Sequence, residues 1–350
     1  MHTIIWVGFF AIIFFLLALD LGVLNRRPHV VTVRESLAWT GFWIAISLTF
    51  NVGVYFLYDR GLMSSPAGLP QLSGLDAAIQ FFTAYVVEKM LSLDNIFVIA
   101  AVMTSFRVPP ASQHRVLFWG VFGALVLRGL MIFAGTAAIR QFSWLMIPLG
   151  ALLVFTGAKM VRSKDGDETE FEENLAIRII RRYVPVTREF EGARFSIRPT
   201  PNARLHVTPL LLALVAIEFT DVIFAIDSVP AVFGVTLDPF LVMTSNIFAI
   251  LGLRALFFAL RAMLDQFRYL KPTVALILVF VGGKMVAGEI FHVHPSPLIS
   301  LAVIGGLLTI GIVLSLALRS DGGAGPSAAG SPDFDDEPDP SRRSKASLED

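Results

Sequence analysis

Two apolar stretches of the chain each carry acidic residues in a similar arrangement. Residues 93–100 read Leu-Asp-Asn-Ile-Phe-Val-Ile-Ala, and residues 220–227 read Thr-Asp-Val-Ile-Phe-Ala-Ile-Asp. A charged side chain at the centre of a bilayer costs about 2.5 to 3.5 kcal/mol on insertion scales, so such residues usually line a pathway for an ion or a substrate. With the glutamate just before each stretch, five acids predict a cation pathway: Glu88, Asp94, Glu218, Asp221 and Asp227.

The polar groups near these acids are oxygen donors. Pro230 removes a backbone donor and clashes with the carbonyl group of Ile226, which predicts a broken helix with free carbonyl oxygens near Asp227. The chain has no cysteine, and oxygen-rich sites select Mn²⁺, Mg²⁺ or Ca²⁺ over Zn²⁺ or Cu⁺. The predicted metal ligands are Glu88, Asp94, Asn95, Glu218, Asp221, Asp227 and Ser228.

Basic residues in the same apolar segments support a second interpretation. These segments contain five bases and five acids. Because buried charges are usually paired, the carboxylates could be counter-ions in structural pairs. A structural role is favoured for Arg128 and Arg254, which could also exchange partners during transport. Lys159 is expected to extend to the membrane surface, and Asn246 to bond between helices. The supporting residues are Lys89, Arg128, Lys159, Asn246, Arg254 and Lys284.

The composition predicts an all-α, polytopic membrane protein. The 350 residues are 55% hydrophobic and only 16% charged, which is too apolar for a soluble core. A membrane-spanning helix needs about 20 apolar residues. Nine runs approach that length: 3–24, 37–58, 77–106, 116–139, 144–161, 207–235, 240–261, 272–287 and 298–318.

The basic residues of the connections predict the orientation. Arginine and lysine are more frequent in the first, third, fifth and seventh connections than in the others. By the positive-inside rule the N-terminus lies outside and the C-terminus in the cytoplasm. Residues 163–205 are then a cytoplasmic segment with an expected amphipathic helix, and residues 319–350 are an expected disordered tail.

Matching motifs predict an internal repeat. Asp221 follows Asp94 by 127 residues, Arg254 follows Arg128 by 126, and Lys284 follows Lys159 by 125. Three helices in each unit, at 76–162 and 206–288, place the second unit upside down relative to the first, as in many secondary transporters. Helices within 1–60 and at 297–318 flank the two units.

Three segments resemble the TerC family of integral membrane proteins, which includes Alx-like manganese exporters. They are residues 87–98, 218–231 and 244–254, and the likeness extends from Asp20 through the ninth predicted helix. The resemblance implies a nine-helix protein of the LysE-like transporter group, associated with Mn²⁺ export and, in other members, with tellurite resistance. The acidic positions of the family fall on the five acids named above.

The predicted function is secondary transport that exports Mn²⁺ or a similar hard divalent cation across the bacterial inner membrane. The expected partners are the metal ion, H⁺ and the lipid bilayer. No nucleotide-binding motif is present, so transport is expected to run on an ion gradient. Proton antiport is the expected coupling, because protons and the metal ion share the same carboxylates. No pair of nucleophile and base stands out in the sequence, so the chain is not expected to be an enzyme. No tightly bound cofactor or nucleic acid is expected. The alternative is a membrane scaffold or assembly factor linked to tellurite or metal stress. The oligomeric state is open.

Overall fold

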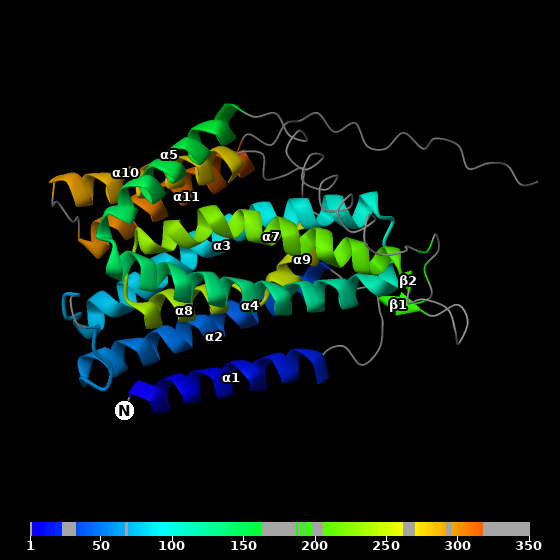
Figure 1. The fold of residues 1–350 in the computed structure, drawn as a ribbon, viewed down its shortest axis with the longest axis horizontal. Coiled ribbons are helices and arrows are strands. Elements are labelled where there is room, and N and C mark those ends of the chain that lie inside the picture. Colours follow the sequence, from blue (N-terminus) through cyan, green and yellow to red (C-terminus); the bar gives the residue numbers. More distant parts are fainter. Residues whose placement is uncertain are drawn as a thin grey trace, which may run out of the picture.

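A computed structural model shows a bundle of long helices (Figure 1). The structure describes residues 2–22, 33–66, 69–162, 187, 190, 192, 194–197, 206–261, 270–291 and 296–317. Most of the predicted cytoplasmic segment, including its expected amphipathic helix, and the C-terminal tail lie outside these residues. The fold class is confirmed as an all-α membrane protein.

The helices follow the predicted apolar segments. They are α1 (His2–Gly22), α2 (Val33–Asp59), α3 (Gly74–Ser105), α4 (Pro110–Gln141), α5 (Met146–Arg162), α7 (Pro209–Phe233), α8 (Pro239–Ile250), α9 (Leu253–Arg261), α10 (Leu270–Phe291) and α11 (Pro297–Ala317). A 3₁₀ turn, η1 (Ser143–Leu145), precedes α5. Six spans among the described residues are long and apolar enough to cross a membrane: Arg34–Asp59, Ser112–Gln141, Ser143–Val161, Pro209–Phe233, Pro272–Phe291 and Pro297–Ser315.

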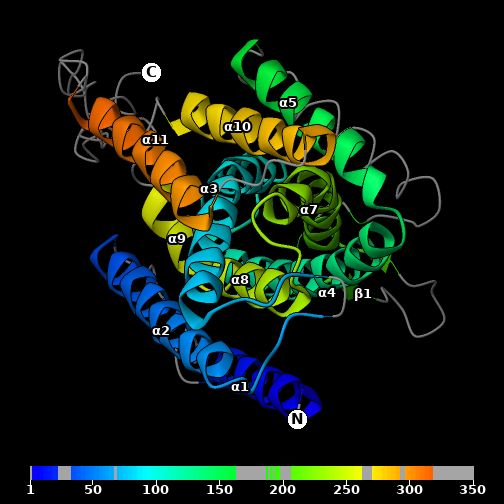
Figure 2. The same cartoon turned by 90° about the vertical axis from the view of Figure 1, so that its left-hand side faces the viewer.

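Helix α3 occupies the middle of the bundle and packs against α2, α7, α8 and α11 (Figure 2). It begins where the Ser73 hydroxyl accepts a hydrogen bond from the Asp76 backbone N–H at 3.1 Å. This N-cap satisfies one of the donors that a helix start leaves free. The residues that α3 carries at its centre therefore meet several helices at once.

Glycines bring α5 and α10 into close contact. A methyl group placed on Gly150 would lie 2.7 Å from the Gly282 carbonyl oxygen, and one on Gly157 would lie 2.6 Å from the Ala275 carbonyl oxygen. Small residues allow backbones to approach in membranes, where packing replaces the hydrophobic effect between helices. The pair α5–α10 is thus fixed by backbone contact.

The helix interruption lies elsewhere than the sequence indicates. Helix α7 continues through Pro230 to Phe233. Pro230 falls in the last turn of α7, so the helix ends soon after it. The predicted helix 240–261 is instead two helices, α8 and α9. They are separated by Leu251 and by Gly252, whose φ is +80°. A methyl group on Gly252 would meet the Trp43 side chain at 2.8 Å.

A short hairpin closes the end of the bundle that the sequence assigns to the cytoplasm. Strands β1 (Ser196–Ile197) and β2 (His206–Val207) pair antiparallel. Phe195 packs with apolar residues of α3, α4 and α7, and the Arg115 guanidinium lies 5.0 Å from the centre of its ring. The hairpin therefore connects directly to the helices that form the site.

Asp238 begins α8 at the opposite end of the bundle. Its buried carboxylate accepts a hydrogen bond from the Phe240 backbone N–H at 3.0 Å. Burial raises the pKa of Asp238 above its ordinary value of 3.8, and interactions with Tyr58, Ser65 and the N–H groups of Phe240 and Leu241 offset part of the rise. The N-cap of α8 is therefore sensitive to pH.

Gly252→Ala should destabilise the protein by at least about 2 kcal/mol. A non-glycine residue in the left-handed region costs about 1 to 2 kcal/mol, and the added methyl group overlaps Trp43. Thermal unfolding in detergent measures the loss. Gly283→Ala is the matched control, because Gly283 is helical and has nothing within 4 Å of the added carbon. Equal melting temperatures for the two variants would contradict the assignment of this break.

Asp238→Asn should change how stability depends on pH. The raised pKa means that native Asp238 holds its proton more tightly than the unfolded chain. Its contribution is fully present below about pH 4 and is lost as pH rises through the native pKa. Asparagine keeps the N-cap and does not ionise. The melting temperature of the variant should therefore rise relative to the wild type from about pH 4 to pH 8; parallel pH curves would count against this prediction.

Candidate functional site

Arg128 is the centre of a buried network of charges. It lies on α4 and is 2% exposed. Its Nε donates to Asp221 Oδ2 at 3.1 Å and its Nη2 donates to Asp221 Oδ1 at 2.9 Å. Its Nη1 forms an ion pair with Glu88 and donates to the Ser228 hydroxyl at 3.3 Å. One guanidinium thus joins two carboxylates from α3 and α7.

Asn95 extends this network on α3. Its side-chain Nδ2 donates to Asp221 Oδ1 at 3.3 Å, and the residue is 4% exposed. Glu88, Ser92 and Asn95 are spaced by four and three residues, so they form one stripe along the helix. Acidic residues from the two similar segments therefore come together where α3, α4 and α7 meet.

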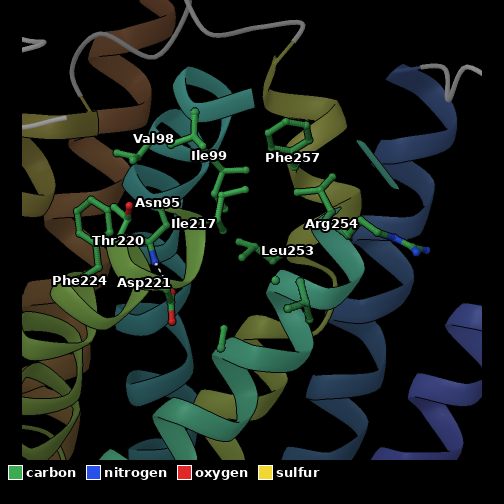
Figure 3. Close-up of a pocket in the computed structure, with 15 residues that line it drawn as sticks. Asn95, Val98, Ile99, Ile217, Thr220, Asp221, Phe224, Leu253, Arg254 and Phe257 are labelled. Carbon is green, nitrogen blue, oxygen red and sulfur yellow. Dashed lines mark hydrogen bonds between the residues drawn. The ribbon is translucent and has the colours of Figure 1, made fainter. Parts of the chain in front are cut away.

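A small, partly open cavity borders Asp221 and extends toward the hairpin side of the bundle. Figure 3 shows Asn95 and Asp221 at one end of this cavity, with the Arg254 side chain directed away from Asp221. The remaining walls are mainly apolar and include Val98, Ile99, Leu117, Ile217, Leu253 and Phe257. An apolar wall with polar groups gathered at one end is typical of a binding site.

The other predicted acids have different surroundings. Asp227 accepts a hydrogen bond from the Thr156 hydroxyl of α5 at 3.1 Å. Glu218 lies against Gly123 of α4, where any larger side chain would overlap its carboxylate. Its Oε2 is buried without a hydrogen-bond partner among the described residues. Asp94 lies on α3, but its side chain falls outside the part of the chain that the structure describes.

The acids do not form a ready metal cluster in this arrangement. The described residues contain no group of three acidic, histidine or cysteine side chains that could hold a metal ion. Two of the predicted ligands, Glu88 and Asp221, are paired with Arg128.

Lys89 serves the interrupted helix rather than the acidic centre. Its buried Nζ donates to the carbonyl oxygens of Ala249 at 3.0 Å and Leu251 at 3.5 Å. These groups end α8, where the helix dipole favours a positive charge. The ammonium group therefore satisfies carbonyl oxygens that the break would otherwise leave free in the membrane.

The remaining supporting residues have different environments. Lys284 donates to the Ser300 hydroxyl of α11 at 2.8 Å, and Lys159 is exposed on α5. The expected interhelical hydrogen bond of Asn246 is wrong, because its buried amide has no partner among the described residues. Thr156, which donates to Asp227, is a residue that no pattern in the sequence indicated.

The chain is similar to known membrane proteins along most of its length. The integral membrane protein TerC family matches residues 73–322. An uncharacterized membrane protein of Myxococcus xanthus is 44% identical over 312 residues, which cover 89% of this chain and 92% of that protein. A Salmonella typhi protein named "Putative membrane-bound redox modulator Alx" is 43% identical over 89% of this chain and 94% of that protein. No solved structure gives a significant match.

Arg128→Met should destabilise the protein by about 3 to 5 kcal/mol, because Glu88 and Asp221 lose their buried counter-ion. Adding Glu88→Gln and Asp221→Asn to the same chain should recover most of that loss, since no uncompensated charge remains. Thermal unfolding in detergent compares the single and triple variants. Arg115→Met, which removes an exposed guanidinium, is the control and should cost about 1 kcal/mol or less. A triple variant no more stable than Arg128→Met would refute this pairing.

Proposed function

The chain belongs to the TerC family of integral membrane proteins, and from this premise we propose that it exports Mn²⁺ or a related hard divalent cation from the cytoplasm. The transporter is secondary and works by alternating access. Its ion site is formed by the carboxylates around Arg128. The protein resides in the bacterial inner membrane.

The observation that carries this proposal is a charged centre at the end of a cavity. A purely structural ion pair needs no access, but here the cavity wall includes both Asp221 and Asn95. Carboxylate and amide oxygens are the ligands that Mn²⁺, Mg²⁺ and Ca²⁺ prefer. An ion that enters from the hairpin side therefore meets oxygen ligands before it meets Arg128.

The binding step is an exchange of cations. Arg128 pairs with both Glu88 and Asp221, but its single positive charge balances only one of the two carboxylates. A divalent cation at Asp221 repels the guanidinium and competes for the same carboxylates. A divalent cation carries two positive charges and so balances both carboxylates, which lowers the cost of keeping them buried. Protons compete for the same oxygens, which supports proton antiport as the coupling.

The packing of the helices supports two inverted units within a protein of nine crossings. Corresponding helices of the predicted units contact each other, α3 with α7, α4 with α8 and α5 with α10. A pseudo-twofold axis between inverted repeats produces such pairs and places the site near the middle of the membrane. The N-terminus is outside and the C-terminus in the cytoplasm in this arrangement.

A membrane scaffold or assembly factor for tellurite or metal stress is the second candidate. The full pairing of Arg128 with Glu88 and Asp221 favours it, because the same contacts would hold three helices together without transport. The redox-modulator name of the relatives fits either candidate. Since this chain has no cysteine, a redox effect would act through a metal ion or another molecule and not through its own thiols.

Asp221→Asn should reduce Mn²⁺ efflux from loaded proteoliposomes at least about tenfold, because the cavity loses its anionic ligand. Asp59→Asn is the matched control. Asp59 is an exposed carboxylate at the end of α2, so its loss should leave the flux unchanged. Collapse of an imposed pH gradient should slow wild-type efflux if protons are the coupling ion.

Two results would overturn the transport proposal. One is wild-type protein that reconstitutes as a folded species and moves none of Mn²⁺, Mg²⁺ and Ca²⁺. The other is wild-type flux that Asp221→Asn leaves intact. The first result would favour the scaffold, and the second would place the pathway away from Arg128. Thermal unfolding of each variant before reconstitution verifies that the compared proteins are folded.

A further inference from the structure

Several polar atoms of α3 and α8 are buried without a hydrogen-bond partner among the described residues. They are both amide atoms of Asn246, the hydroxyl of Ser92 and Oε2 of Glu88. None of these residues is more than 1% exposed. An unsatisfied buried polar group costs about 1 to 3 kcal/mol, and ionic or water ligands commonly account for such groups. These atoms therefore require an explanation beyond packing.

The helix contacts place Asn246 level with the Glu88–Arg128 pair. Ala84 of α3, Ile132 of α4 and Val242 of α8 belong to one apolar cluster. One turn further along α3 is Glu88, which pairs with Arg128, one turn before Ile132 on α4. The helices α3 and α4 therefore run in opposite directions at this point.

Helix α8 runs in the same direction as α3. Val242 packs near Ala84, and the later carbonyl groups of Ala249 and Leu251 meet Lys89. Asn246 lies one turn after Val242 and on the same face, because residues four apart share a face. Glu88 lies one turn from Ala84 on α3, and Arg128 lies one turn from Ile132 on α4. The Asn246 amide is therefore directed to the side of α8 that faces these two residues.

Glu88 and Asn246 lie beyond Arg128 from the cavity. Glu88 precedes Asn95 by seven residues on α3, a separation of about 10 Å along the helix axis. Asn95 borders the cavity, whereas neither Glu88 nor Asn246 does. The guanidinium of Arg128 contacts Asp221 on one side and Glu88 on the other. Two sets of oxygen atoms are therefore arranged on the two sides of one guanidinium group.

We infer that Asn246 is a ligand of a second position for the divalent cation, which it shares with Glu88 once Arg128 has moved. This inference rests on the proposed transport function and deepens it. The Asn246 amide oxygen and the Glu88 carboxylate supply hard oxygen ligands, and the Ser92 hydroxyl lies one turn from Glu88. The ion passes from Asp221 and Asn95 to Glu88 and Asn246 as it leaves the cytoplasmic cavity.

Asn246→Leu tests this inference with two readouts that move in opposite directions. Leucine has a similar size and removes an unsatisfied amide, so the melting temperature without metal should rise. The rise in melting temperature that MnCl₂ causes through binding to the native state should shrink, and Mn²⁺ efflux should fall at least about tenfold. Asn246→Asp keeps an oxygen ligand and should retain the metal-induced rise.

Ser245→Ala is the matched control. Ser245 is buried on the same helix, but its hydroxyl donates to the Val242 carbonyl oxygen of that helix at 3.2 Å, so both metal readouts should stay at the wild-type level. Wild-type values for the metal-induced rise and the flux in Asn246→Leu would overturn this inference alone. A wild-type protein with neither a metal-induced rise nor flux would overturn the transport proposal together with it.

Discussion

The absence of water in the membrane interior requires each buried charge to find a partner inside the bundle. Arg128 meets this requirement for two carboxylates at once, because its planar guanidinium donates in parallel to Asp221 and also reaches Glu88. Arginine suits this role better than lysine, whose ammonium group cannot form the same paired geometry. The relative positions of α3, α4 and α7 depend on this single side chain, and so does access to the oxygen atoms that a metal ion would use.

A second charge has a comparable role at the break between α8 and α9. Lys89 is adjacent to Glu88 in the sequence, yet the two side chains serve different helices. Lys89 binds the carbonyl groups that end α8, while Glu88 binds Arg128 of α4. A movement of α3 would therefore change the contacts both around Arg128 and at the break between α8 and α9. Gly252 and Trp43 fix the direction in which α9 leaves that point and continues along the cavity.

The charged residues around Arg128 could serve a structural role or ion binding. The cavity beside them distinguishes the two roles. Ion pairs alone would stabilise a bundle, but replacing them with apolar residues would often stabilise it as well. The transport proposal therefore depends on the cavity beside Asp221 and not on the ion pairs alone. The cavity reaches Asp221 and Asn95 but not Glu88. An ion that arrives from the cavity would therefore meet Asp221 but not Glu88, although Arg128 pairs with both.

The sequence by itself determined the helical membrane class, the family and the acids at the core of the site, because apolar length and the cost of buried charge are local properties of the chain. It also indicated Arg128 as an ion-pair residue. Only the tertiary structure decided which acids share a partner: Glu88 and Asp221 meet Arg128, Asp227 meets Thr156, and Lys89 meets α8. It also moved the helix break from Pro230 to Gly252. Such pairings depend on how helices distant in sequence are packed, and helical periodicity gives the face of a residue without giving its neighbour.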